Sequence, residues 1–406
     1  MKTKKQPEKN GSDARLLFVL AGALVLAVIF IAVIMLTTSG DSTSKDAIRI
    51  GAIYNLNGSQ SSLDIPSSQG ARLAAWEINE RGGIHGRNID LIVVDGKTNT
   101  TEIAAAAARL INEDHVQAII GMSDSDMVLP AAQTAAKSGV VFVTSGATSP
   151  LLPAQVPGYL YLSCFGDNTQ AAAAAEFAQS DLHATTAAVI TDRSMEYTRL
   201  LSRYFTERFT TGGGNITGTV QYDGGRGNYR SAIITSGMST THPDVVFVAC
   251  GPADCGTVIR AVREAGITVP VIGGDSLDSP QLAGTIGPGA DQVYYTTHAD
   301  ISTSSNDKAT NAFIKRYYTE FGEEPNAFSA LGYDAVNVVA QAMSTSPSPA
   351  DLREGLSAIQ GYDGLTGTIS YRNQSQIPDK SVTLMEIKNG TVILIGERMP
   401  RIVPAP

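Results

Sequence analysis

The sequence is poor in the residues and motifs on which most enzymes depend. Only five histidines occur in 406 residues, and there is no P-loop, no Gly-x-Ser-x-Gly elbow and no His-Glu-x-x-His motif. With so few histidines, a histidine-containing metal cluster or catalytic triad is not expected. The sequence therefore predicts a protein that is not an enzyme and that uses no metal or cofactor.

A surplus of basic residues is also missing. Residues 1–15 carry five bases and two acids, so the rest of the chain has a net charge of −12 within a total of −9. A nucleic-acid-binding surface needs a basic patch. A chain this acidic argues against a nucleic acid as its partner.

Cysteine is scarce, with only Cys164, Cys250 and Cys255 present. Outside the cytoplasm, Cys250 and Cys255 could form a local disulfide across the intervening Gly-Pro-Ala-Asp. Zinc binding is the alternative, but no histidine lies near them and their spacing does not suit a zinc site. A disulfide and free thiols stay about equally open for this pair, and Cys164 is expected to be a free, buried thiol.

One apolar run stands out near the start of the chain. Residues 16–36 are uninterrupted by charge and long enough to cross a bilayer. A cleaved signal peptide has a shorter apolar core and a small-residue cleavage site, and neither is found here. We therefore expect a single-pass signal anchor at 16–37. The positive-inside rule then keeps the basic tail at 1–15 in the cytoplasm, so the protein is in the cell membrane with its C-terminal ectodomain outside.

After a Ser/Thr-rich tether at 38–46, apolar strand-like runs alternate with helical patterns along the chain. Alternation at this spacing predicts right-handed βαβ units, and so an α/β fold with parallel sheets and helices on both faces. The length suits two doubly wound parallel-sheet lobes joined by a hinge. The strand at 293–297 is expected to lead back to the first lobe. The expected limits are 47–165 plus 299–379 for lobe 1 and 166–298 plus 380–400 for lobe 2.

Two neighbouring predicted strands end in loops of small hydroxyl and glycine residues. The strand at 116–121 is followed by Met-Ser-Asp-Ser-Asp at 122–126, and the strand at 140–143 by Thr-Ser-Gly-Ala-Thr-Ser-Pro at 144–150. In an open parallel sheet such loops lie together at the carboxyl edge, where ligands bind. Free N–H groups at the start of the next helix suit a carboxylate. The pair of loops favours a ligand site over ordinary capped turns.

These two segments, GMSDSDMVLP and VVFVTSGATSP, resemble the signature region of periplasmic binding proteins of the leucine/isoleucine/valine type. Two further phrases, AAWEINERGGIHGR at 74–87 and GYDA at 332–335, are similar to phrases of the same family. The resemblance covers residues 48–395. It implies the type I periplasmic binding fold and a solute-binding function.

The resemblance also implies ligand contacts in lobe 1. Ser125 matches the serine that binds the ligand carboxylate. Gly146, Ala147 and Thr148 match a turn whose carbonyl and hydroxyl hold the ammonium and whose N–H groups hold the carboxylate. Leu63 stands where the family has a tyrosine, so the wall of the pocket differs there.

In lobe 2 the resemblance implies that Tyr197 closes over the ligand and that Asp275 pairs with its ammonium. A zwitterion needs neutral donors at one end and a carboxylate at the other. Asp275 and Ser125 are expected to face the open cleft, so replacing either should change the stability of the unliganded protein little.

Two acids, Asp124 and Asp126, flank the key serine. They are interpreted as solvent-facing or helix-capping residues. The alternative is a ligand that is cationic or an amide in place of a plain zwitterion.

The sequence thus predicts a membrane-anchored solute-binding protein that closes on a small polar ligand, an amino acid or amide, and delivers it to an ABC permease. An extracellular sensor domain that signals through a partner protein is the alternative. A cytoplasmic tail of 15 residues is too short for a signalling domain, which favours transport.

Overall fold

The structure, a computed structural model, describes residues 47–227, 229–303, 305, 307–345, 352–372 and 375–406. The predicted membrane segment at 16–37 and the tether at 38–46 lie outside these residues. Among the described helices, none has the length and apolar character that a bilayer crossing requires. Residues Ile48–Pro406 form one unit, to which everything below refers.

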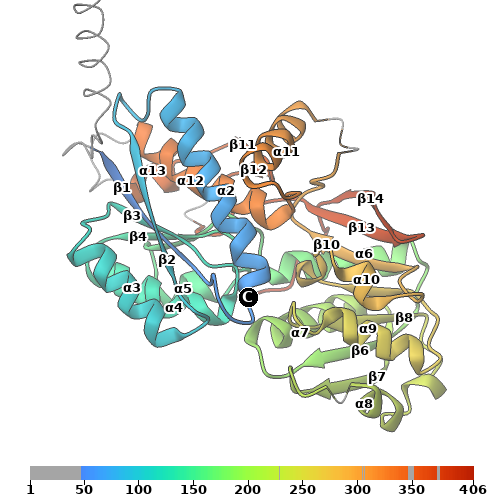
Figure 1. The fold of residues 1–406 in the computed structure, drawn as a ribbon. Coiled ribbons are helices and arrows are strands. Elements are labelled where there is room, and N and C mark those ends of the chain that lie inside the picture. The colour runs from blue at the N-terminus through green and yellow to red at the C-terminus, as the bar shows by residue number, and fades with distance from the viewer. Residues whose placement is uncertain (1–46, 228, 304, 306, 346–351, 373–374) are drawn as a thin grey trace, which may run out of the picture. The chain divides into compact units, whose positions relative to one another are not determined.

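The first sheet is parallel throughout, as the alternation of strands and helices predicts, with the strand order β2-β1-β3-β4-β5 (Figure 1). Its strands are β1 (Ile48–Tyr54), β2 (Ile89–Asp95), β3 (Ala118–Gly121), β4 (Val141–Thr144) and β5 (Leu160–Leu162). Successive residues of a strand point to opposite faces. Accordingly, Ile50 and Ala52 pack in one core cluster and Ile53 packs in the cluster on the other face.

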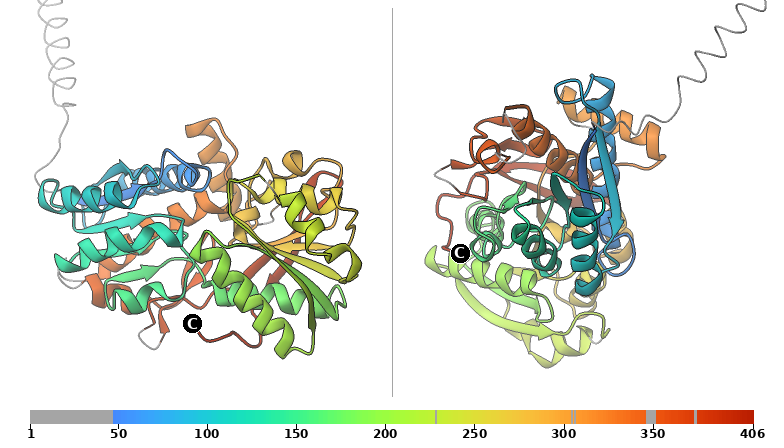
Figure 2. Two further views of the ribbon diagram at one scale, coloured as in Figure 1. Left: turned by 90° about the horizontal axis from the view of Figure 1, so that it is seen from below. Right: turned by 90° about the vertical axis from the view of Figure 1, so that its left-hand side faces the viewer.

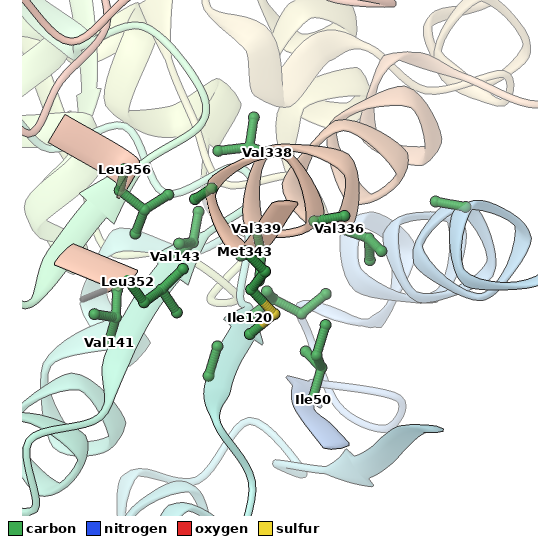
Figure 3. Close-up of a cluster of buried hydrophobic side chains, with 14 of the residues drawn as sticks. Ile50, Ile120, Val141, Val143, Val336, Val338, Val339, Met343, Leu352 and Leu356 are labelled. Carbon is green, nitrogen blue, oxygen red and sulfur yellow. The ribbon is translucent and has the colours of Figure 1, made fainter. Parts of the chain in front are cut away.

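Helices cover both faces of this sheet. One face carries α2 (Ser61–Glu80), α12 (Ala327–Thr345) and α13 (Leu352–Ser357), and the other carries α3 (Thr100–Asn112), α4 (Ser125–Lys137) and α5 (Leu152–Gln155). Figure 3 shows Val336, Val339 and Met343 of α12 directed at Ile120 and Val143 of the sheet. Helix α11 (Lys308–Phe321) packs against α2. We call this sheet, its helices and the hairpin β11 (Tyr362–Gly364) to β12 (Gly367–Ile369) lobe 1.

The second sheet has the order β14-β13-β10-β9-β8-β6-β7. It is parallel from β7 to β10, whereas β13 and β14 are antiparallel additions at one side. Its strands are β6 (Thr186–Asp192), β7 (Asn215–Tyr222), β8 (Val245–Ala249), β9 (Val271–Gly273), β10 (Val293–Thr297), β13 (Val382–Lys388) and β14 (Thr391–Arg398). The strand expected at 293–297 is β10, which pairs with both β9 and β13 in this sheet, and the chain returns to lobe 1 after it.

Helices also flank the second sheet on both sides (Figure 2). The helices α6 (Asp167–Ser180) and α7 (Glu196–Thr211) pack on one face. The other face carries α8 (Tyr229–Thr235), α9 (Cys255–Glu264), α10 (Leu282–Ile286) and the short 3-10 turn η1 (Met238–Thr240), while a second such turn, η2 (Asp275–Leu277), follows β9. We call this sheet with its helices lobe 2.

The chain passes between the lobes three times, after β5, after β10 and after β12. The first and third crossings meet at a buried polar contact. Lys380, in the third crossing, donates from Nζ to the carbonyl of Ser163 in the first crossing, 3.0 Å away, and to Thr366 Oγ1. Burial lowers the pKa of Lys380 to about 8, although the charge of nearby Asp334 opposes that shift. The hinge region is therefore tied together by one buried cation.

Helices α2 and α12 cross in close contact, and two glycines permit this. A Cβ on Gly332 would collide with the carbonyl of Ser67, and a Cβ on Gly70 would collide with the carbonyl of Ser329. The glycine of the GYDA phrase thus serves helix packing. Its neighbour Asp334 accepts bonds from Thr366 and holds the β11–β12 turn.

Replacing Gly332 with alanine should therefore lower the free energy of unfolding by about 1–3 kcal/mol, the usual cost of overpacking. Gly284 is the matched control, because it lies exposed in α10 and an added Cβ there meets nothing within 4 Å. Gly284→Ala should be neutral or stabilising by up to about 1 kcal/mol. Urea denaturation of both variants tests this, and equal effects would contradict the packing argument.

Candidate ligand-binding site

The carboxyl ends of strands from both sheets meet at a small cavity between the lobes. Its volume is about 20 Å³, on the order of the space for one water molecule. A ligand of amino-acid size can therefore enter only if the lobes separate or the wall rearranges. Lobe 1 contributes Gln60, Leu63, Ser123, Asp124, Ser125, Thr148 and Phe328, and lobe 2 contributes Met195, Tyr197, Pro252, Asp275 and Ser276. We call this space the inner cavity.

Ser125 and Thr148 supply hydroxyl groups on the lobe 1 side, as the sequence predicts for these loops. Ser125 is the first residue of α4 and directly follows the capping residue Asp124. Its Oγ accepts a bond from the N–H of Ser149 at 3.0 Å. Because Oγ accepts in that bond, its own proton can be donated to a ligand.

Gly146 and Ala147 are not brought to the inner cavity. The N–H of Gly146 donates to the carbonyl of Met122 at 3.2 Å, and the N–H of Ala147 donates to Thr144 Oγ1 at 3.2 Å. The carbonyl of Ala147 accepts from Cys164 Sγ. The backbone groups predicted to bind the ligand are used here to hold the ends of β3 and β4 together.

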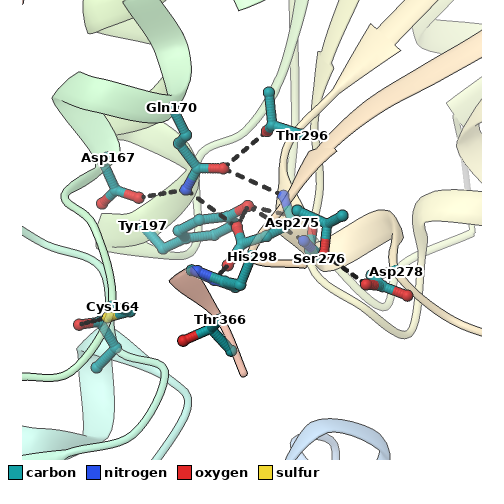
Figure 4. Close-up of polar contacts among 12 residues, drawn as sticks. Cys164, Asp167, Gln170, Tyr197, Asp275, Ser276, Asp278, Thr296, His298 and Thr366 are labelled. Carbon is teal, nitrogen blue, oxygen red and sulfur yellow. Dashed lines mark hydrogen bonds and ion pairs between the residues drawn. The ribbon is translucent and has the colours of Figure 1, made fainter. Parts of the chain in front are cut away.

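Asp275 is the polar centre of the lobe 2 side and is only 3% exposed. The Tyr197 hydroxyl donates to its Oδ1 at 2.7 Å, and Gln170 Nε2 donates to the same oxygen at 3.0 Å. His298 Nε2 lies 3.0 Å from Oδ2. Figure 4 shows these side chains directed at the carboxylate from α6, α7 and the segment after β10. The predicted counter-charge is therefore already held by three side chains of its own lobe.

Electrostatics keep this carboxylate ionised. Burial by itself raises the pKa of Asp275, but hydrogen bonds from His298, Tyr197 and Gln170 outweigh it and the net direction is downward. Burial also lowers the pKa of His298. Asp167, bridged to Asp275 through Gln170, has its pKa raised well above the usual value by burial and by repulsion from Asp275. The pKa values of the two neighbouring carboxyls are therefore shifted in opposite directions.

Leu63 and Phe328 form the apolar part of the wall. Both are buried, and they pack with Leu331 in one small cluster. Phe328 also meets the edge of the His298 ring, with centroids 6.2 Å apart, while Phe165 stacks on that ring at 4.0 Å. The imidazole that holds Asp275 is itself fixed by aromatic rings from the hinge and from lobe 1.

Asp124 is buried, at 4% exposed, and caps α4. Its Oδ1 accepts from the N–H of Asp126 at 3.0 Å. Its Oδ2 has no hydrogen-bond partner among the described residues. Burial, with repulsion from Asp126 and Asp64, raises the pKa of Asp124 to about 7. The interpretation of Asp124 as a helix-capping acid is confirmed, and its placement toward solvent is wrong.

Asp126 makes a different contact, which joins the two lobes. Its two carboxylate oxygens accept from the N–H of Glu196 at 2.9 and 3.0 Å, and one accepts from the N–H of Tyr197 at 3.4 Å. These N–H groups belong to the first turn of α7 in lobe 2. A carboxylate at a helix N-terminus is favourable because it satisfies free N–H groups and opposes the helix dipole. Asp126 of lobe 1 thus caps a helix of lobe 2.

Sequence reasoning missed several residues of this site. Gln60 lies in the polar loop after the first strand, directly before α2, and that position gives only a weak signal of a binding role. Gln170 and His298 lie in the chain at points where no local pattern marks a binding role. They contact Asp275 only because the folded chain brings these distant segments together near the hinge.

The structure places the Sγ atoms of Cys250 and Cys255 2.08 Å apart, at bonding distance. Cys255 is the first residue of α9, and Pro252 between the two cysteines lines the inner cavity. Cys164 is buried and free. A disulfide here would hold the loop after β8 against the wall of the site.

Comparison with known proteins agrees with this architecture. The family model described as periplasmic binding protein matches residues 47–391, so the chain belongs to the periplasmic binding protein family. The Leu/Ile/Val-binding protein BraC3 of Rhizobium johnstonii is 24% identical over 351 residues, which cover 85% of this chain and 93% of that protein. The leucine-specific-binding protein of Salmonella typhimurium is 23% identical over 362 residues, which cover 88% and 93%.

Solved structures of the same kind share the fold of this chain. The leucine binding protein LivK of Thermotoga maritima is 29% identical with a TM-score of 0.79, covering 87% of this chain and 99% of that one. The branched-chain amino acid transporter substrate binding protein LivJ of Streptococcus pneumoniae, solved in complex with isoleucine, is 25% identical with a TM-score of 0.79, covering 86% and 99%. The resemblance seen in the sequence motifs is confirmed, and so is the α/β fold with parallel sheets.

The three bonds to Asp275 correct one expectation about stability. Because the carboxylate is buried and bonded, Asp275→Ala should leave buried donors on Tyr197, Gln170 and His298 unpaired. We expect the unliganded variant to lose roughly 1–3 kcal/mol of unfolding free energy. Urea denaturation without ligand measures this. A variant as stable as the wild type would mean that these bonds contribute nothing in solution.

Proposed function

We propose that the protein is an extracytoplasmic solute-binding protein that captures a small polar ligand, an amino acid or amide, by lobe closure and delivers it to an ABC permease. One observation carries this proposal. The inner cavity combines hydroxyl donors from lobe 1 with a buried, ionised carboxylate from lobe 2. The family and the names of its relatives, which bind leucine, isoleucine and valine, support the same class of ligand.

The carboxylate of Asp275 has room for one more hydrogen bond. A carboxylate offers about four lone-pair sites, and Tyr197, Gln170 and His298 occupy three of them in the described structure. A ligand ammonium takes the fourth. The hydroxyl groups of Ser125 and Thr148 then lie at the other side of the cavity, where a ligand carboxylate accepts from them.

Closure completes the site. Groups from both lobes contact the ligand only when the lobes meet, so ligand binding stabilises the closed arrangement over the open one. Asp126 also stabilises the closed form, because its carboxylate accepts hydrogen bonds from a backbone N–H group of α7 in the other lobe. Capture requires binding and hinge motion, and no bond of the ligand is made or broken.

The binding function is tested by calorimetric titration of the full-length protein in detergent. The panel contains aliphatic, amide and basic amino acids, and we expect at least one to bind. For that ligand, Asp275→Asn should lower affinity by roughly thirtyfold or more, because the ammonium is then buried without a counter-charge. Asp278→Asn is the control, since this nearby buried carboxyl lies outside the inner cavity. No binding by any member of the panel would overturn the proposed ligand class.

The proposal includes a location at the cell membrane, with the described unit outside the cytoplasm. It rests on the apolar run at 16–36 and the basic residues before it. A tether at 38–46 then holds the binding unit near the permease it serves.

Retention of this anchor predicts that the protein sediments with membranes and that alkaline carbonate does not release it. A variant in which a cleavable signal peptide replaces residues 1–37 should be exported as a soluble form with unchanged ligand affinity. Recovery of the natural protein as a soluble form that starts near residue 38 would contradict an uncleaved anchor.

A further inference from the structure

Three buried side-chain oxygens in the wall of the inner cavity lack partners among the described residues, and two of them, unlike the hydroxyl of Ser123, can only accept hydrogen bonds. Asp124 Oδ2 and Gln60 Oε1 have no hydrogen-bond partner among the described residues. The side chains are 4% and 5% exposed. An unpaired buried acceptor costs free energy, and such atoms in native structures usually mark a ligand contact or a bound ion.

These two residues stand where the inner cavity meets a larger one. The outer cavity has a volume of about 370 Å³ and shares Gln60, Asp124, Met195 and Pro252 with the inner cavity. A ligand whose amino-acid part contacts Asp275 would therefore send its side chain past Asp124 into the outer cavity.

The charges along this route have one sign. Asp126, Asp192 and Asp254 line the outer cavity, and no lysine, arginine or histidine lines either cavity among the described residues. Asp192 and Asp254 are held by backbone N–H groups, from Ser194 and Gly224 for the first and Gly225 for the second. An aliphatic side chain placed here would remove water from the carboxylates without offering a hydrogen bond or an opposite charge, so its binding would cost free energy.

We propose that the ligand is an α-amino acid whose side chain ends in a cation, which binds Asp124 Oδ2 and Gln60 Oε1. This rests on the proposed solute-binding function and deepens it. The cation supplies the missing donors to both oxygens and neutralises Asp124, which no lysine, arginine or histidine of the described residues faces across either cavity. The backbone of the ligand keeps the contacts with Asp275, Ser125 and Thr148.

The test compares ligands that differ only in the side-chain cation. Lysine is paired with norleucine and ornithine with norvaline, and each is titrated by calorimetry into the full-length protein. We expect the basic member of at least one pair to bind about tenfold or more tightly than its neutral partner, the usual worth of a hydrogen bond to a charged group.

Asp124→Asn separates this contact from the helix cap. Asparagine caps helices as well as aspartate does, so α4 should stay intact. In this variant the preference for the cationic member should fall to within about threefold. The neutral member should bind at least as tightly as to the wild type, because an amide costs less to desolvate than a carboxylate. Asp126→Asn is the comparison variant, because it removes another carboxylate of the outer cavity and also alters the cap on α7. It should weaken both members of a pair, and it should reduce the preference for the cationic member less than Asp124→Asn does.

The pH dependence gives a second readout with a definite sign. The acids that face Asp124 are Asp126 on its own helix, Asp64 on α2 and, across the outer cavity, Asp192 and Asp254. Because the pKa of Asp124 is about 7, acidification from pH 8 to pH 5.5 protonates it. The affinity for lysine should then fall by up to about tenfold per pH unit, and the affinity for norleucine should not. Asp124→Asn should remove the difference.

Each outcome decides the matter. If the neutral members bind as tightly as the basic ones, or if acidification strengthens lysine binding, the cationic side chain is refuted while amino-acid binding stands. If no amino acid binds at all, this inference and the proposed function fall together.

Discussion

The buried carboxylate of Asp275 is the constraint on which the binding site depends. It remains charged in a nearly water-free position because Tyr197, Gln170 and His298 all bond to it. The need to satisfy that charge explains why a glutamine and a histidine from distant parts of the chain converge at η2. It also explains why Asp167, only one glutamine away, has a raised pKa. Lobe 2 thus presents one fixed negative charge, oriented before any ligand arrives.

The same carboxylate links the site to the hinge. His298 lies just after β10, where the chain leaves lobe 2, and its ring stacks on Phe165 of the first crossing. Lys380 of the third crossing contacts the carbonyl of Ser163 close by. A ligand ammonium that binds Asp275 would therefore contact a carboxylate whose partner, His298, also packs against the hinge. In the proposed function, ligand occupancy and lobe angle would share these contacts, as coupling by population shift requires.

Local patterns in the sequence predict the α/β fold well, because βαβ alternation and glycine-rich turns can be recognised within short stretches of the chain. They also place Ser125, Thr148 and Asp275 at strand ends, and the structure brings all three to one cavity. They do not reveal which strands flank β10, because its neighbours in the sheet, β9 and β13, are separated by more of the chain than a local pattern covers. The orphan oxygen of Asp124 is likewise invisible in sequence, since a capping aspartate usually has solvent at its second oxygen.

Neighbouring acids in one loop carry out separate physical tasks. Asp126 bonds only to the backbone of α7, so it favours the closed arrangement whatever the ligand is. Asp124 lies one position before Ser125 and places an oxygen without a hydrogen-bond partner in the cavity wall, which is why we propose that it distinguishes one ligand from another. A closure contact changes the affinity for all ligands alike, whereas selectivity needs a contact that differs between ligands. Placing both acids around Ser125 allows the selectivity of the loop to change while its contribution to closure stays the same.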